Sequence, residues 1–244
     1  MVDWDDFDSA TYVAQNYGRE ILPEDRQIMD FVVSELRNLR MPSNGIRMAA
    51  DIGAGPNLYP GLLLAPYVNS SGALELIEYS AANRRYLRKS FEGADGNALA
   101  VWLRFERHLQ QLGHSASIQK LRTVAKVRAG SVYDLPVDRY EAITCFFVLE
   151  SITADVDLVA AGLDSVMRSL KPGGLFVTAH MVGSTGYEVR PGQSYPACDL
   201  TMPEIEKSYE PYGTFRSILT SPSPQQAVRA GYHGMAALVG RRRS

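Results

Sequence analysis

The segment DIGAGPNLYP, residues 51–60, follows a short apolar run at residues 48–52 and places two glycines around one alanine. An apolar run that ends in such a loop is typical of the first strand of an α/β sheet, where the glycines let the backbone approach a ligand closely. A dinucleotide-binding loop needs a third glycine beside the pyrophosphate, but Pro56, Asn57 and Leu58 stand there instead. The loop therefore favours a nucleoside that carries a short zwitterionic tail over a dinucleotide.

Strand and helix patterns alternate along the rest of the chain, which predicts an α/β fold with a seven-stranded, mostly parallel sheet and helices on both faces. No repeat or low-complexity linker interrupts the pattern, so we expect one domain over residues 1–244, with residues 1–45 forming a helical cap over the site. The strands are expected at residues 48–52, 73–77, 123–132, 140–148, 175–181, 214–220 and 235–239. Helices are expected at residues 23–39, 62–64, 81–91, 97–114 and 159–170, and from a capping box at residue 201.

The composition narrows the class of protein. The chain has 244 residues, 45% of them hydrophobic and 21% charged, with a net charge of −2. This charge gives no field for nucleic acid or for an anionic membrane, so we expect neither as a partner. The chain begins without an apolar signal and holds no apolar run of membrane-spanning length, and Cys145 and Cys198 lack metal-ligand spacing. We expect a cytoplasmic protein with reduced cysteines and no metal.

An acidic residue ends the second predicted strand. Glu78 stands 23 positions after Gly55, and a carboxylate at this spacing can accept hydrogen bonds from both hydroxyls of a ribose. A proline-glycine break at residues 171–174 later leads into the fifth strand. The loop, the acid at a strand end and this break together predict a site for S-adenosyl-L-methionine.

Three segments resemble one known family. DIGAGPNLYP, IEYSAANRRYL (residues 77–87) and SLKPGGLFV (residues 169–177) are similar to the nicotinamide, phenylethanolamine and indolethylamine N-methyltransferases. The resemblance extends from about Tyr12 to Arg241. It implies a Rossmann-like class I methyltransferase fold, S-adenosylmethionine as cofactor, a small-molecule methyl acceptor and a monomeric protein.

The resemblance also implies roles for residues around the cofactor. Glu78, in place of the commoner aspartate, would bind the ribose, with Tyr79 over the adenine. Where the family usually has an Asp-Val pair beside the adenine, this chain has Ser131 and Val132, and a hydroxyl bonds the adenine amino group less strongly than a carboxylate. The full set of expected cofactor-binding residues is Tyr12, Tyr17, Asp51, Gly53, Gly55, Asn57, Tyr59, Glu78, Tyr79, Asn83, Ser131, Val132 and Phe146.

The acceptor side is expected at the ends of the fourth and fifth strands. Glu150 stands where the family keeps an acid that helps to bind a substrate amine, although a carboxylate at a helix start has the same appearance. His180 stands where amine-methylating relatives carry a carboxylate; an imidazole there suits proton removal from a phenol or ring N–H, or is structural. These two residues are the candidate catalytic groups. Ser184 and Tyr187 match polar positions that the family uses around the substrate. Phe146, Phe147 and Tyr195 form either an aromatic wall for a flat acceptor or ordinary packing.

Three functions remain open at this point. The first is methylation of a nitrogen on an aromatic heterocycle or amine, in specialised metabolism. The second is O- or C-methylation in the same pocket, with His180 as the base. The third is a module without catalysis, which senses S-adenosylmethionine or holds a partner. A nicotinamide-dependent dehydrogenase is excluded by the missing third glycine.

Overall fold

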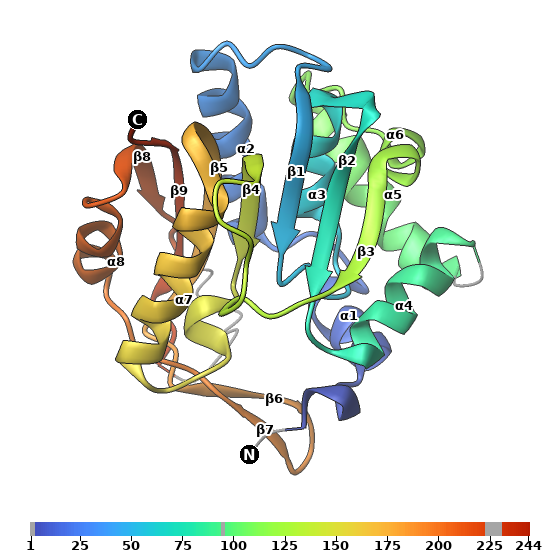
Figure 1. The fold of residues 1–244 in the computed structure, drawn as a ribbon. Coiled ribbons are helices and arrows are strands. Elements are labelled where there is room, and N and C mark those ends of the chain that lie inside the picture. Colours follow the sequence, from blue (N-terminus) through green and yellow to red (C-terminus); the bar gives the residue numbers. More distant parts are fainter. Residues whose placement is uncertain (1–2, 94–95, 223–230) are drawn as a thin grey trace.

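The computed structural model describes residues 3–93, 96–222 and 231–244, and a seven-stranded sheet forms its centre (Figure 1). The strands of this sheet are β1 (Ile46–Ile52), β2 (Val68–Glu78), β3 (Ala125–Ala129), β4 (Tyr140–Phe146), β5 (Leu170–Val182), β8 (Gly213–Leu219) and β9 (Gly234–Arg242). Their order is β3-β2-β1-β4-β5-β9-β8, in which β1 to β5 run parallel and β9 runs antiparallel to both of its neighbours. The predicted α/β class with a seven-stranded, mostly parallel sheet is confirmed.

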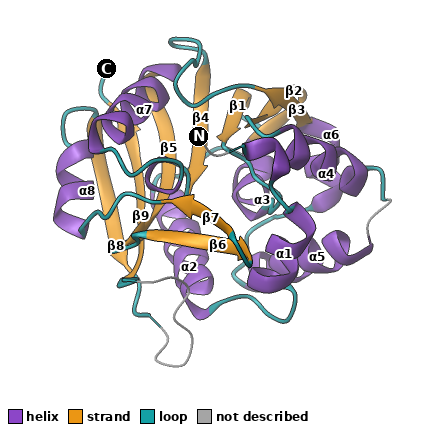
Figure 2. Ribbon diagram, turned by 90° about the horizontal axis from the view of Figure 1, so that it is seen from below, coloured by secondary structure: helices purple, strands orange, loops and turns teal. Residues whose placement is uncertain are grey.

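Helices cover both faces of the sheet (Figure 2). The α-helices are α1 (Ser9–Tyr17), α2 (Pro23–Asn38), α3 (Tyr59–Leu64), α4 (Ala81–Phe91), α5 (Gly96–Gln111), α6 (Ile118–Val124), α7 (Val156–Ser169) and α8 (Met202–Tyr209), with 3₁₀ turns η1 (Trp4–Asp6), η2 (Ala65–Tyr67) and η3 (Leu149–Ser151). Buried residues of α1 to α6 form one core layer against the sheet, and those of α7 and α8 form the other. Strand side chains alternate between the layers: Val177 and Ala179 of β5 belong to the first, and Phe176 belongs to the second.

Several predicted boundaries differ from those of the structure, for example at β2, which begins at residue 68 rather than 73, and two of the errors have a clear local cause. The strand expected over 123–132 begins at Ala125, because α6 occupies the residues before it, where Ser117 caps the helix and Leu121 and Val124 are buried. The proline-glycine break at 171–174 lies inside the beginning of β5, where the register with β4 shifts as in a β-bulge, rather than before the strand.

A two-stranded hairpin, β6 (Gly186–Arg190) and β7 (Gln193–Pro196), was not predicted. It crosses the carboxyl-end edge of the sheet and lies beside the N-terminal residues (Figure 1). Phe7 and Tyr195 are buried against each other with ring centroids 5.4 Å apart, and the Gln193 side chain donates to the Asp6 carbonyl oxygen at 3.0 Å. The hairpin and η1 thus form one cover.

Only part of residues 1–45 forms the expected cap over the site. In the described part of that range, η1 and α1 lie over the carboxyl ends of the strands, and Ser9 at the start of α1 donates to the Asn83 side chain at 2.7 Å. Helix α2 does not join this cover, since Ile28, Val32 and Leu36 are buried in the core layer of the sheet. Burial of its apolar stripe against β9 explains the difference.

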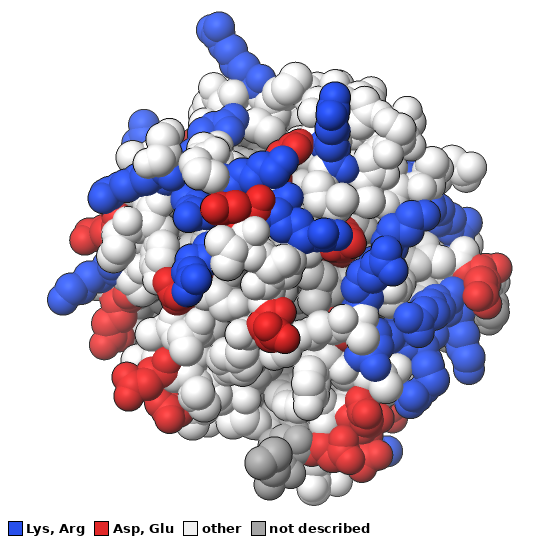
Figure 3. Space-filling view, viewed as in Figure 1, with Lys and Arg blue, Asp and Glu red and all other residues white. Residues whose placement is uncertain are grey.

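Charges of both signs lie on the face shown in Figure 3. Lys and Arg gather over the β3 and α4 side, where α4 carries four of them, and Asp and Glu lie among them and along the lower rim. None of the helices in residues 3–93, 96–222 and 231–244 has the length and apolar character that a membrane crossing requires.

Candidate cofactor and acceptor site

A cavity of about 1360 Å³ opens at the carboxyl ends of β1, β2 and β4. The strand order reverses at β1, which lies between β2 and β4, so the connections after β1 and after β4 lead to opposite sides of the sheet. Such a topological switch point is where α/β sheets bind their ligands. All residues expected to bind the cofactor line this cavity. The remaining lining residues are Asp3, Trp4, Asp5, Phe7, Ala54, Pro56, Pro60, Ser80, Arg84, Ala129, Gly130, Tyr133, Phe147, Val148, Ser151, Ile152, Thr153, Ala154, Leu158, Tyr187 and Pro196.

The glycine loop has the backbone form that the sequence indicated. Gly53 and Gly55 adopt positive φ angles of 67° and 56°, a region that favours glycine. A Cβ atom at Gly53 would stand 2.4 Å from a methyl group of Val148, so even alanine would not fit there without movement of the chain. The Gly53 amide donates to the Ile77 carbonyl oxygen at 2.8 Å, which fixes the loop to the end of β2.

Glu78 is held at the cavity wall by backbone amides. Its Oε2 accepts from the Gly55 N–H at 2.8 Å and its Oε1 accepts from the Ser80 N–H at 2.7 Å. Burial raises the pKa of Glu78, and these two amides and the Asn83 side chain counteract only part of that rise. Each carboxylate oxygen keeps a lone pair for a ligand hydroxyl, so the geometry suits a ribose.

Arg84 contributes to the site, and the interpretation of the sequence missed it. Its guanidinium donates to the Glu78 carbonyl oxygen at 2.8 Å and also to that of Tyr79, so it secures the turn that presents both side chains. The signal was present in the IEYSAANRRYL segment, one turn of helix after Glu78. Tyr79 itself is 64% exposed, so its ring face is available to stack on a flat ligand.

Buried polar atoms without partners mark the other end of the cavity. Asp51 Oδ1 accepts from the Thr144 hydroxyl at 2.7 Å, but its Oδ2 is buried without a hydrogen bond. Both amide atoms of Asn57 are also buried without a hydrogen bond of ordinary geometry. Burial raises the pKa of Asp51 to about 7. Such atoms are costly unless a ligand satisfies them, and an amino-acid tail offers both an ammonium donor and a carboxylate acceptor.

Aromatic rings surround the space between these two ends. Phe147 is held at φ 59°, a conformation that is strained for an aromatic residue, and its ring packs against Phe146 at 5.9 Å. Trp4 and Phe7 of the cover were not predicted as site residues, although their place in the segment WDDFDSATY, just before Tyr12, is a usable signal.

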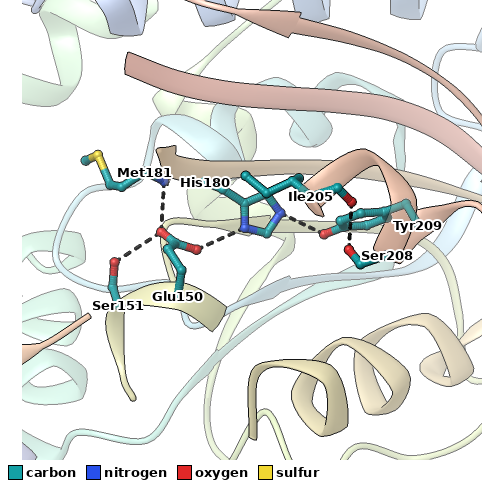
Figure 4. Close-up of polar contacts among 7 residues, drawn as sticks. All are labelled: Glu150, Ser151, His180, Met181, Ile205, Ser208 and Tyr209. Atoms are coloured by element: carbon teal, nitrogen blue, oxygen red, sulfur yellow. Dashed lines mark hydrogen bonds and ion pairs between the residues drawn. The ribbon is translucent and has the colours of Figure 1, made fainter. Parts of the chain in front are cut away.

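The two predicted catalytic residues do not reach the cavity, which corrects their expected contact with the acceptor. Neither Glu150 nor His180 lines it, and both are almost fully buried in the core layer of α7 and α8 (Figure 4). His180 Nδ1 lies 2.9 Å from Glu150 Oε2, and His180 Nε2 lies 2.9 Å from the Tyr209 hydroxyl. Alternation along β5 explains the placement, since His180 points to the face opposite that of Ala179.

Glu150 is stabilised in its charged form by this network. Its Oε1 accepts from the Met181 N–H at 3.0 Å and from the Ser151 hydroxyl at 3.1 Å. Burial alone would raise its pKa, but the hydrogen bond and charge of His180, together with the Met181 amide, hold it below the usual range. Its own carbonyl oxygen accepts from the Cys198 N–H at 2.7 Å. The network therefore ties η3 to β5 and to the segment after β7.

The other substrate-side candidates divide in the same way. Tyr187 lines the cavity and stacks on Tyr195 with ring centroids 5.3 Å apart. Tyr195 is buried behind it and does not line the cavity. Ser184 is fully buried outside it, and its hydroxyl has no hydrogen-bond partner among the residues that the structure describes. Within the described residues, no group of three or more His, Cys, Asp or Glu side chains is arranged to hold a metal ion.

A parallel sheet with a nucleoside-sized site at this switch point, a ribose-binding acid and an opening for an acceptor define a class I S-adenosylmethionine-dependent methyltransferase. Residues 3–243 match the model of the NNMT/PNMT/TEMT family, and the chain belongs to this family. Its cofactor is therefore S-adenosylmethionine, and the expectation of an enzyme, rather than a sensor or partner module, is confirmed. Among curated proteins, none matches the chain.

Solved structures share the fold. A candidate sarcosine dimethylglycine methyltransferase from Galdieria sulphuraria is 13% identical, with a TM-score of 0.60 over 97% of this chain and 99% of that one. A 1,6-didemethyltoxoflavin-N1-methyltransferase from Burkholderia thailandensis, with 1,6-didemethyltoxoflavin and S-adenosylhomocysteine bound, is 15% identical, with a TM-score of 0.53 over 90% and 80%. A candidate S-adenosylmethionine-dependent methyltransferase from Listeria monocytogenes is 12% identical, with a TM-score of 0.53 over 87% and 99%.

Proposed function

We propose that this enzyme transfers a methyl group to a nitrogen atom of a flat small molecule, an aromatic heterocycle or an aromatic amine. The cofactor supplies a methyl group that is already activated on a sulfonium. The protein has to hold the acceptor in line with that methyl, exclude water and avoid protonating the nucleophile. A ring nitrogen or neutral amine attacks through its lone pair and needs no proton removed beforehand.

The placement of His180 carries the proposal. Its two ring nitrogens face Glu150 and Tyr209, and no histidine is found among the described residues that line the cavity. The second candidate function, O- or C-methylation, depended on His180 as a base in contact with the acceptor. Because His180 does not reach the cavity, O- or C-methylation loses this support, whereas a nitrogen lone pair requires no such base.

The lining of the cavity also fits this class of acceptor. Phe7, Phe147 and Tyr187 offer ring faces to a flat molecule. Charged lining residues are mostly acidic, with Arg84 the one cation among those described, so a neutral or cationic acceptor is favoured over an anion. The Burkholderia thailandensis neighbour supports the proposal, because that protein is an N1-methyltransferase, with its heterocycle bound, on the same fold.

The test is a methyl-transfer assay with product mass spectrometry on a mixed panel of N-heterocycles, amines, phenols and carboxylic acids. We expect a product that is one methyl heavier, with the methyl on nitrogen. Methylation of phenols or carbon acids alone, with nitrogen acceptors untouched, would contradict the proposal. Cofactor binding is measured in parallel, so that an inactive preparation is not mistaken for a negative result.

Phe147 provides a second test on the acceptor side. We expect Phe147→Gly to raise the KM for the acceptor about tenfold or more, because the ring face is lost. The Kd for S-adenosylhomocysteine should change by less than about threefold. Glycine relieves the positive-φ strain, so the melting temperature should fall less than for Phe147→Ala, the matched control, which keeps the strain. An unchanged KM would place the acceptor elsewhere.

A further inference from the structure

Another buried carboxylate, Asp25, lies behind the cavity wall. Asp25, in the first turn of α2, is fully buried. Its Oδ1 accepts from the Tyr59 hydroxyl at 2.8 Å, and its Oδ2 is buried without a hydrogen bond. The Tyr59 ring lines the cavity directly after the glycine loop. A carboxylate in this position is costly to keep in an apolar core.

The polar surroundings of Asp25 come from three helices. Its neighbour Glu24 adds negative charge, and the Tyr59 hydroxyl of α3 stabilises the ionised form. The buried Tyr17 and the half-buried Tyr12 of α1 lie near this group, since Asp25 acts on the pKa of Tyr17 and both tyrosines act on that of Tyr59. The arrangement places negative potential beneath the part of the cavity that Asn57 and Tyr59 line.

Positive groups near this cluster are occupied elsewhere. Arg104 of α5 donates to the Tyr17 carbonyl oxygen, and His108 of the same helix lies between Arg26 and Asp30, 3.3 Å from the Asp30 carboxylate. The described parts of β8 and β9 that pack on α2 contribute apolar side chains such as Ile218 to this core layer. The groups that shift the pKa of Asp25 are Tyr59 and Glu24, with no cation among the described residues, so a cationic ligand in the cavity would supply a matching positive charge.

We propose that Asp25, acting through Tyr59, is a positioning residue that makes the site favour the sulfonium form of the cofactor over its neutral thioether product. S-adenosylmethionine and S-adenosylhomocysteine share the adenosine, the ammonium and the carboxylate, and they differ by one methyl group and one positive charge. An ionised Asp25 beneath the cavity stabilises the charged form and not the neutral one. The pair thereby helps to release the product after each turnover.

The preference should depend on pH with a defined sign. Burial raises the pKa of Asp25 from 3.8 to about 7. Below that pH the carboxyl is protonated and does not distinguish the two ligands; above it the carboxylate favours the cation. Binding of S-adenosylmethionine near neutral pH should therefore release a proton from Asp25, and binding of S-adenosylhomocysteine should not.

The test measures the Kd of both ligands by isothermal titration calorimetry, without an acceptor, between about pH 6 and about pH 8.5 and in buffers of different ionisation enthalpy. We expect the ratio of the S-adenosylhomocysteine Kd to the S-adenosylmethionine Kd to rise about tenfold with pH, which corresponds to a shift of about one pKa unit. Asp25→Asn should abolish this rise and the excess proton release. Asp51→Asn, the matched control, should weaken both ligands and retain the rise.

Two further measurements separate this role from a structural one. Tyr59→Phe removes the hydrogen bond that lowers the pKa of Asp25, so the rise in the ratio should move to higher pH. Asp25→Asn should also raise the melting temperature at about pH 8, because a carboxyl whose pKa is raised loses its stabilising contribution as pH rises through the folded value. A ratio that is flat in the unmodified protein, or a rise retained in Asp25→Asn, overturns the proposal. Neither result depends on which acceptor is methylated.

Discussion

Glu78→Ala is expected to weaken S-adenosylmethionine binding by about a hundredfold or more, which corresponds to roughly 3 kcal/mol of lost hydrogen bonds to a charged group. The carboxylate faces the cavity and is oriented by the Gly55 and Ser80 amides, so its free lone pairs are fixed in place before the ribose arrives. Removing it leaves both ribose hydroxyls and both amides without their acceptor. Calorimetric titration with S-adenosylmethionine, without an acceptor, measures the loss directly.

The fold should tolerate this change well. Burial raises the pKa of Glu78, so the free protein becomes less stable as the pH rises and this carboxyl ionises. A neutral side chain at this position does not ionise, and the protein avoids that loss of stability. Glu78→Gln, the matched control, should keep its melting temperature within a few degrees and still lose cofactor affinity, by about tenfold. Unchanged affinity in both variants would refute the ribose assignment.

Glu150→Ala is expected to lower the free energy of unfolding by about 3–5 kcal/mol, because it removes a buried carboxylate that accepts several hydrogen bonds. The substitution leaves His180 Nδ1, the Met181 N–H and the Ser151 hydroxyl without their acceptor in a fully buried place. Glu150→Gln can still accept from Met181 and contact the imidazole, so its loss should be about 1–2 kcal/mol. Urea denaturation followed by circular dichroism measures both.

The pH dependence checks the cause of this loss. Since the pKa of Glu150 is held below 4.5, its contribution to stability is present above that value and is lost as pH falls through the folded pKa. The difference between the unmodified protein and Glu150→Gln should therefore shrink below about pH 4.5. The Kd for S-adenosylhomocysteine in folded Glu150→Gln should change by less than about threefold. A stable Glu150→Gln protein that binds cofactor normally yet loses all turnover would return Glu150 to the catalytic site.

The sequence by itself determined the class of fold and picked out the expected cofactor residues, all of which line one cavity. Those features depend on short-range patterns: the apolar run before the glycine loop, the spacing from Gly55 to Glu78, and the capping box at Thr201, which the structure contains. Chain direction places the ends of parallel strands together, so residues named from local motifs met in one cavity. Errors in the predicted helices and strands stayed local, as at α6, where the buried side chain of Leu121 stabilises a helix.

Only the tertiary structure decided the acceptor half. His180 and Ala179 are adjacent in sequence, yet alternation along β5 sends them to opposite faces, and the packing of Tyr209 from α8 fills the place beside the imidazole. The end of β5 had suggested that His180 is a base in the pocket, but there His180 forms a buried structural pair with Glu150. For Asp25 the sequence carried no signal, because an acidic residue at the start of a helix is common. Only the structure shows that the hydroxyl of Tyr59, 34 positions away in the cavity wall, donates a hydrogen bond to it.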